Sequence, residues 1–145
     1  MSKIALEMAA VEVARTVLTH LRNGEIDEAI NRFSDALRFK DHGLGLEFNN
    51  KEGLAEFFRK TRALYPEHLL ETDTVFASGD RVIMEWTLLA TITEPFYGAP
   101  RKFLVSVRGV SIVRTEDGKI SDWADYYDGR TSRRNALAAQ FEDWI

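Results

Sequence analysis

The spacing of apolar residues divides the chain into a helical first half and a stranded second half. In the first half, apolar residues recur at steps of three, four or seven, which places them on one face of a helix. This spacing predicts a helix, a second short helix, an extended segment and a third helix, over residues 4–22, 25–34, 36–42 and 51–65. Asn23-Gly24 ends the first of these helices, and Pro66 ends the last.

In the second half, apolar residues alternate with polar ones, as they do along strands whose two faces differ. The alternation predicts four long strands, over residues 68–77, 80–94, 101–115 and 119–128. Gly79-Asp80 and Asp117-Gly118 are typical of the hairpin turns that would join them. The spacing of a helix returns at the end of the chain, over residues 131–143.

One predicted strand changes its pattern midway. Its apolar residues stand at odd positions as far as Val107 and at even positions from Val110 onward. The change falls at Arg108-Gly109. A glycine at such a point is typical of a β-bulge, so we expect a bulge that bends the sheet sharply there.

Helices that precede a meander of antiparallel strands indicate the α+β class. We therefore expect residues 1–145 to form one domain, a cone-shaped, strongly bent antiparallel sheet with helices packed on its concave side. Such a cone encloses a pocket at its open end. Met84, Trp86 and Leu88 share one parity, so we expect them on an apolar outer face. A second copy of the chain would cover this face, in a homodimer formed sheet to sheet.

Composition narrows the classes of function. The formal net charge is -4 with both signs mixed along the chain, and no basic run indicates a nucleic-acid partner. The chain has no cysteine, which excludes disulfides, thiolate catalysis and zinc–thiolate sites. No apolar run approaches the roughly 18 residues that cross a membrane, and the first residues lack the apolar core of a signal peptide. We expect a cytoplasmic protein with no membrane partner.

The segment GKISDWADYYDG, residues 118–129, holds the first candidate for chemistry. On a strand, Trp123, Asp125 and Tyr127 share one face, with the carboxyl group between two aromatic rings. Burying an ionised, unpaired carboxylate there costs roughly several kcal/mol, so such a group often has a raised pKa suited to proton transfer. The alternative is an aspartate at the rim, paired with Arg130 or Arg133.

Two more carboxyl groups, Asp41 and Glu85, fall on strand faces that we assign to the interior. Carboxylates in one apolar pocket cannot all stay ionised cheaply, so one keeps its proton and the set supplies both an acid and a base. We expect Trp123, Tyr127, Phe39 and Thr87 to line this pocket around Asp125, Glu85 and Asp41. No metal-ligand spacing is present, and this chemistry requires no cofactor.

Each of these two assignments has a structural alternative. Glu85 has basic neighbours in the predicted sheet, such as Arg101 or Arg108, with which an ion pair would suffice to explain it. Asp41 stands just before Gly43, where a carboxylate commonly caps a turn.

The order of elements, the turn TEDGKI at 115–120 and the segment WADYYD at 123–128 resemble the nuclear-transport-factor-2-like superfamily. Within it, the chain is most similar to SnoaL-like polyketide cyclases and limonene epoxide hydrolase. The hydrolase has a W-x-D motif whose aspartate helps to activate a water, which the resemblance carries onto Trp123-Ala124-Asp125. Its Arg-x-Asp and Tyr-x-Asn pairs correspond to residues 85–87 and 39–41, where this chain reads Glu-Trp-Thr and Phe-Lys-Asp.

Ketosteroid isomerases offer a second comparison within the superfamily. Residues 33–42 align with their first strand and place Asp41 at the position of the general base. Val17 and Val110 stand where those enzymes have their two oxyanion-hole donors. Without such donors, enolate chemistry loses its largest single stabilising interaction.

Together these observations predict a SnoaL-like small-molecule enzyme of the cyclase, isomerase or hydrolase type. It would act by general acid–base catalysis on an apolar, oxygen-bearing substrate held in the cone. Asp125 would be the principal acid or base, with Glu85 or Asp41 as its partner. The alternative is a non-catalytic protein of the same fold, either a binder of small apolar ligands or a structural dimer.

Overall fold

A computed structural model describes residues 2–65, 68–96 and 99–130 of the chain. Its elements are α1 (Lys3–Arg22), α2 (Ile26–Ile30), β1 (Phe33–Asp41), β2 (Leu46–Phe48), α3 (Lys51–Leu64), β3 (His68–Ser78), β4 (Arg81–Phe96), β5 (Ala99–Glu116) and β6 (Lys119–Tyr127). The predicted helices and long strands are present, except for the helix predicted at 131–143, which lies outside the described residues. The second helix is shorter than predicted because β1 begins at Phe33, and β2 was not predicted.

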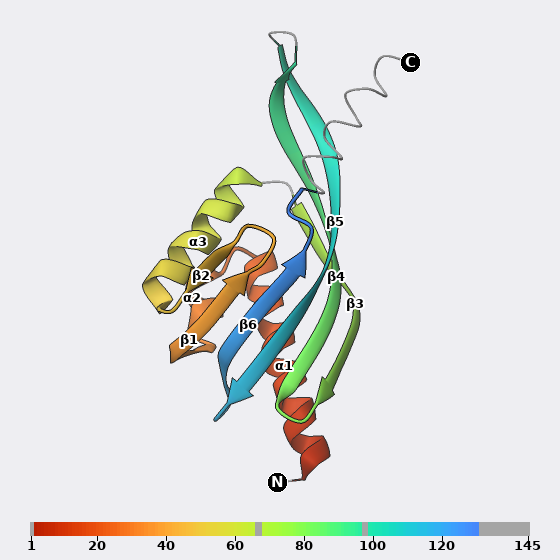
Figure 1. The fold of residues 1–145 in the computed structure, drawn as a ribbon. Coiled ribbons are helices and arrows are strands. Elements are labelled where there is room, and N and C mark those ends of the chain that lie inside the picture. Colours follow the sequence, from red (N-terminus) through yellow and green to blue (C-terminus); the bar gives the residue numbers. More distant parts are fainter. Residues whose placement is uncertain (1, 66–67, 97–98, 131–145) are drawn as a thin grey trace.

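The six strands form one bent, unclosed sheet in the order β2-β1-β6-β5-β4-β3. Neighbouring strands are antiparallel except for β1 and β6, which run parallel. Figure 1 shows α1 crossing behind the sheet, so that the helices cover one face and leave the other open. The α+β cone predicted from the sequence is therefore confirmed, with one parallel strand pair in an otherwise antiparallel sheet.

The hydrophobic core lies between the helices and the sheet face turned toward them, which we call the inner face. Small residues of α1, such as Ala10 and Ala14, let the helix approach the sheet closely. Large residues of the sheet fill the space between, among them Phe33, Leu37, Phe39, Met84, Val113, Ile120 and Trp123. The rings of Phe39 and Trp123 are stacked with centroids 6.2 Å apart, which joins β1 to β6.

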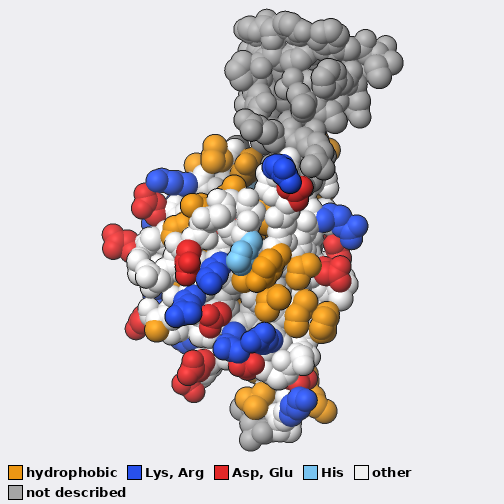
Figure 2. Space-filling model, viewed as in Figure 1, with side chains coloured by type: hydrophobic (Ala, Val, Ile, Leu, Met, Phe, Trp, Pro, Cys, Tyr) orange, Lys and Arg blue, Asp and Glu red, His pale blue; other side chains and the backbone are white. Residues whose placement is uncertain are grey.

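The structure reverses the faces that the sequence predicts for β4. Met84 and Trp86 are buried on the inner face, with 0% and 7% of their surface exposed, and Leu88 shares their parity. Apolar side chains nevertheless gather on the open outer face (Figure 2). The outer positions include Phe76, Ile83, Val110, Ile112, Ala124 and Tyr126. The prediction of an apolar outer face rested on the wrong residues, since β4 has apolar side chains on both faces.

The predicted β-bulge at Gly109 is also wrong. Strands β4 and β5 pair in unbroken register from Arg81 opposite Arg114 to Phe96 opposite Ala99. Gly109 lies opposite Trp86, and a Cβ atom built on it would come within 2.4 Å of the indole ring. The glycine is therefore explained by the bulk of its neighbour, and the apparent change of phase reflects apolar residues on both faces of β5.

No helix in the part of the chain that the structure describes is long and apolar enough to cross a membrane.

Candidate functional site

The register of the sheet places two carboxyl groups side by side. Asp41 ends β1 and pairs with Asp125 on the parallel strand β6, and the His42 amide donates a hydrogen bond to the Asp125 carbonyl over 2.9 Å. Both side chains lie on the inner face; only 5% of Asp41 is exposed, and Asp125 is half-buried. We call these two residues the carboxyl pair. Like charges at such close quarters favour retention of a proton by one member.

A buried hydroxyl group lies beside the carboxyl pair on the next strand of the sheet. Ser111 on β5 lies opposite Asp125, and only 1% of it is exposed. Its hydroxyl donates a hydrogen bond to Asp125 Oδ1 and accepts one from Trp86 Nε1 over 2.8 Å. Trp123 Nε1 donates a second hydrogen bond to Asp125 Oδ1 over 2.7 Å. The carboxyl group is thus held between two indoles, one directly and one through a serine.

Burial raises the pKa of Asp125 to about 6. The hydrogen bonds from Ser111 and Trp123 act in the opposite direction, because they stabilise the carboxylate, and the negative charge of Asp41 raises the pKa further. A pKa near 6 lets the group accept or release a proton close to neutral pH. A raised pKa is what the sequence predicts for a carboxyl group between the side chains of Trp123 and Tyr127.

Asp41 has a defined structural role as well. Its Oδ1 accepts a hydrogen bond from the Leu44 amide over 2.9 Å, so it caps the turn that follows β1. The turn-capping alternative therefore describes Asp41 correctly, and it leaves the carboxyl group in place beside Asp125. Burial raises the pKa of Tyr127, as do a hydrogen bond with Asp41 and the charge of that residue, so the phenol stays neutral.

Tyr127 lies two residues after Asp125 on β6, in the next row of inner-face side chains. Its ring is half-buried, with its centroid 5.9 Å from that of Trp86. The ring also lies directly over Gly43, where a Cβ atom would come within 2.2 Å of it. Glycines at positions 43 and 109 therefore give space to the two aromatic rings above the carboxyl pair. Phe39 and Trp123 lie on the other side of the pair, buried in the core.

Two predicted site residues do not join this site, and their placement on the interior face was wrong. Glu85 is exposed on the outer face, because the neighbouring residue Trp86 occupies the inner position. Thr87 also lies on the outer face, where its hydroxyl donates a hydrogen bond to Asp73 over 3.0 Å. Asp41 is the carboxyl group that the register brings to Asp125.

The alternative of a rim aspartate paired with arginine is not what the described residues show. The side chain of Arg130 lies 3.6 Å from a carboxyl oxygen of Asp128. Arg133 lies outside the described residues. Within the part of the chain that the structure describes, no cluster of three histidine, aspartate or glutamate residues is arranged to hold a metal ion.

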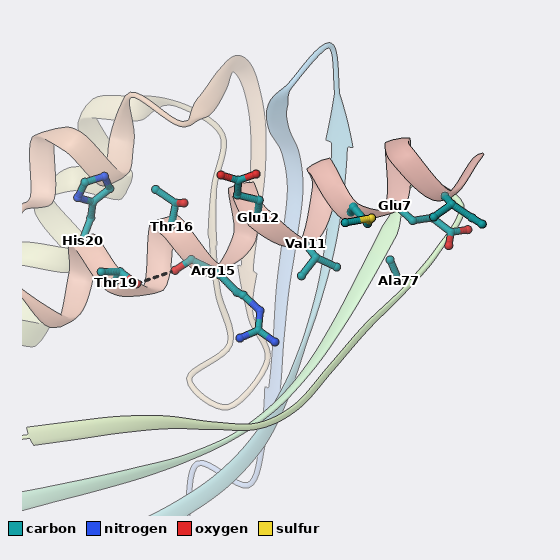
Figure 3. A pocket seen from close by; sticks show the side chains of 10 residues that line it. Glu7, Val11, Glu12, Arg15, Thr16, Thr19, His20 and Ala77 are labelled. Carbon is teal, nitrogen blue, oxygen red and sulfur yellow. Dashed lines mark hydrogen bonds between the residues drawn. The ribbon is translucent and has the colours of Figure 1, made fainter. Parts of the chain in front are cut away.

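A groove of about 610 Å³ runs along α1, away from the carboxyl pair. Figure 3 shows its side chains, most of them on one side of the helix and Ala77 on β3. Apolar residues such as Ile4, Met8 and Val11 alternate there with charged ones such as Glu12 and Arg15. None of the predicted site residues lines this groove. We therefore locate the candidate site at the carboxyl pair, where two carboxyl groups and the phenol of Tyr127 converge on the inner face.

Sequence reasoning missed Ser111 and Trp86. Ser111 could have been found from its position in the strand. It is a polar residue at an odd position of β5, where Val105, Val107 and Val113 are also buried. The false change of phase at Gly109 hid this signal, because it continues the apolar pattern at the even positions Val110 and Ile112 and so passes over Ser111.

Comparison with known proteins agrees with this architecture. The model of the SnoaL-like domain family matches residues 14–123. A putative SnoaL-like polyketide cyclase from Jannaschia sp. CCS1 is 19% identical with a TM-score of 0.78, over 92% of this chain and 94% of that one. An LEH-like epoxide hydrolase from M. tuberculosis is 20% identical with a TM-score of 0.71, over 95% of this chain and 96% of that one. No curated protein matches the sequence.

A third solved structure shows how broad this likeness is. An NTF2-like protein of unknown function from Burkholderia pseudomallei K96243 is 17% identical with a TM-score of 0.70, over 88% of this chain and 97% of that one. At such identities, the solved structures establish the fold, and chemistry has to be argued from this chain's own residues.

Proposed function

This chain belongs to the SnoaL-like domain family, and from that premise we propose that it is an enzyme which transfers protons on an apolar, oxygen-bearing small molecule. The observation that carries the proposal is the carboxyl pair, with Asp125 held at a pKa of about 6 beside Asp41. An acid or base of this strength is suited to proton transfer near neutral pH. No metal ion or organic cofactor is needed for this chemistry.

In the proposed mechanism, Asp125 exchanges the proton and Asp41 acts on it electrostatically. The charge of Asp41 favours the protonated form of Asp125, as its contribution to the raised pKa indicates. In its carboxylate form, Asp125 would take a proton from carbon next to a carbonyl group, as in aldol cyclisation or isomerisation, or from a water that adds to the substrate. Tyr127 would form the rim of the binding site, while Phe39 and Trp123 support the pair from the core.

The test is turnover by wild type and Asp125→Asn on a panel of polyketide-like ketones, terpene epoxides and other small carbonyl compounds. We expect Asp125→Asn to reduce kcat by at least about 100-fold, since a general acid–base group contributes roughly that much or more. Asp73→Asn is the matched control, because Asp73 is exposed and lies on β3, three strands away from the β6 strand that holds Asp125. Full activity in Asp125→Asn on a compound that wild type converts would contradict the proposed function.

A non-catalytic binding protein is the second candidate, favoured by one specific observation. Asp41 caps a turn, and Asp125 is held by two hydrogen bonds, so each carboxyl group also has a structural role. On this alternative, compounds of the panel would raise the melting temperature of wild type without product formation. A bound ligand at 100 times its Kd would add about 2.7 kcal/mol to the free energy of unfolding.

The apolar outer face further leads us to propose a homodimer formed sheet to sheet. We expect light scattering at micromolar concentration to give twice the chain mass of 16.6 kDa. Ile112→Lys, which places a charge among Ile83, Val110 and Tyr126 on that face, should give the mass of one chain. A wild-type mass of 16.6 kDa would show that this face stays open to solvent.

A further inference from the structure

Ser111 is a buried hydroxyl group that the proposed function does not use. Only 1% of it is exposed, and it belongs to the same row of the sheet as the carboxyl pair. The corresponding inner positions of β5 are valines at 105, 107 and 113. A polar side chain at such a position costs stability unless it is hydrogen-bonded, so its partners indicate what it does.

The two partners of Ser111 determine the direction of its hydroxyl proton. An indole N–H can only donate, so the hydrogen bond between Trp86 Nε1 and Ser111 Oγ occupies an acceptor position of the serine. The single hydroxyl proton is then directed to Asp125 Oδ1. Trp86 therefore orients Ser111 as a donor toward the carboxyl group, although it does not itself touch that group.

Trp123 acts on the same oxygen. Its indole N–H also can only donate, and it reaches Asp125 Oδ1 over 2.7 Å. Among the residues that the structure describes, both hydrogen bonds to this carboxyl group end at Oδ1. An oxygen that accepts two donors is a poor site for a proton. The acid form of Asp125 therefore carries its proton on Oδ2.

We propose that Ser111 and Trp86 are positioning residues, which hold Asp125 Oδ1 as a fixed acceptor and leave Oδ2 as the oxygen that gains and loses the proton. We call the Trp86–Ser111–Asp125 chain the relay. This inference rests on the proposed function, because it names the atom of Asp125 that would act in it. Gly109 belongs to the same arrangement, because only a residue without a Cβ leaves space for the Trp86 ring.

The experiment is an NMR titration that does not depend on a substrate. Carboxyl carbon shifts report the pKa of Asp125, and indole N–H signals report Trp86 and Trp123. In wild type, we expect both indole signals to shift with the midpoint of Asp125. In Ser111→Ala, the pKa of Asp125 should rise by about one unit, because a donor to the carboxylate is lost. The Trp86 signal should then no longer follow the titration, while the Trp123 signal should.

Two further variants separate positioning from packing. Ser111→Thr keeps the hydroxyl group, so the pKa should stay near that of wild type. Trp86→Phe should raise the pKa by less than Ser111→Ala does, and it should add nothing in the Ser111→Ala background, because its effect passes through Ser111. Val105→Ala is the packing control, since Val105 is buried on the same face of β5 with 2% exposed. It should lower stability without moving the pKa.

An unchanged pKa of Asp125 in Ser111→Ala would overturn the relay. A Trp86 indole N–H signal in wild type that does not shift with the midpoint of Asp125 would overturn it as well. Failure of the proposed function looks different. If Asp125→Asn kept full turnover while Ser111→Ala raised the pKa, Asp125 would not be the acid–base group, yet the relay would stand. If turnover were lost in Asp125→Asn while the pKa of Asp125 stayed unchanged in Ser111→Ala, the proposed function would stand and the relay would be overturned.

Discussion

Asp125→Asn is expected to raise the free energy of unfolding at pH 8 by about 2 kcal/mol, while it removes the proposed activity. The folded protein raises the pKa of Asp125 from 3.8 to about 6, so an ionised Asp125 at pH 8 is destabilising. One pKa unit corresponds to about 1.36 kcal/mol, which makes roughly 2–3 kcal/mol the upper bound of this penalty. Asparagine removes the charge and keeps an Oδ1 acceptor for Ser111 and Trp123.

The sign of this effect gives it a characteristic pH dependence. Between pH 4 and pH 6, the folded state binds more protons at Asp125 than the unfolded state does. The contribution of Asp125 to the free energy of unfolding of wild type therefore falls as pH rises. Well below pH 3.8 the group is protonated in both states. We therefore expect the stability difference between Asp125→Asn and wild type to be smallest near pH 3.5, to grow through pH 4–6 and to level off above pH 7.

Urea unfolding at pH 3.5, 5, 6.5 and 8 measures this difference directly. Titratable groups distant from Asp125 contribute equally to both proteins, so their contributions cancel in the comparison. Asp73→Asn is again the control, and its difference from wild type should show no comparable rise over pH 4–6. The prediction would be contradicted if the stability difference between Asp125→Asn and wild type were constant with pH, or if wild type were the more stable at pH 8. Either result would mean that the folded protein does not disfavour the ionised form of Asp125.

The position of Asp125 could be predicted because its own strand contains the whole signal. Trp123, Asp125 and Tyr127 alternate in one short segment, and a strand has only two faces. The aromatic neighbours therefore determine which face the carboxyl group occupies. The helices and long strands could be predicted for the same reason, since their periodicity is local.

The partners of Asp125 could not be assigned in this way, because they depend on which strands are neighbours. Asp41 reaches Asp125 through a parallel pairing of β1 with β6, and these strands are far apart in the sequence. Glu85 was predicted as a partner from parity alone, and β4 carries apolar residues at both parities. Only the burial of Trp86 determines which parity faces inward, and that burial depends on the space that Gly109 leaves on the next strand.

Pairing of β1 with β6 also brings together a group of aromatic rings next to Asp125. We call this group, Phe33, Phe39, Phe58 and Trp123, the aromatic cluster. Phe33 begins β1, and no part of its side chain is exposed. Its ring centroid lies 6.0 Å from that of Trp123, 6.5 Å from that of Phe39 and 6.5 Å from that of Phe58. Through these contacts it connects β1, β6 and α3 around Trp123, whose indole N–H donates a hydrogen bond to Asp125. The side chain is thus central to the part of the core that holds the site.

Phe33→Ala is expected to lower the free energy of unfolding by about 3–5 kcal/mol, because it removes a fully buried ring and leaves a cavity. Phe33→Leu fills much of that space and should cost less than half as much. Leu64→Ala is the control, since 70% of Leu64 is exposed at the end of α3, and it should change stability by less than about 0.5 kcal/mol.

Urea midpoints for these three variants test the cluster, and the Asp125 carboxyl signal shows whether the site depends on it. Loss of the Phe33 ring lets Trp123 shift, so its hydrogen bond to Asp125 Oδ1 should weaken. That hydrogen bond lowers the pKa of Asp125, so the pKa should rise in Phe33→Ala wherever the variant remains folded. An equal loss of stability in Phe33→Ala and Phe33→Leu, with no change in this pKa, would show that the ring neither fills the core nor positions the indole.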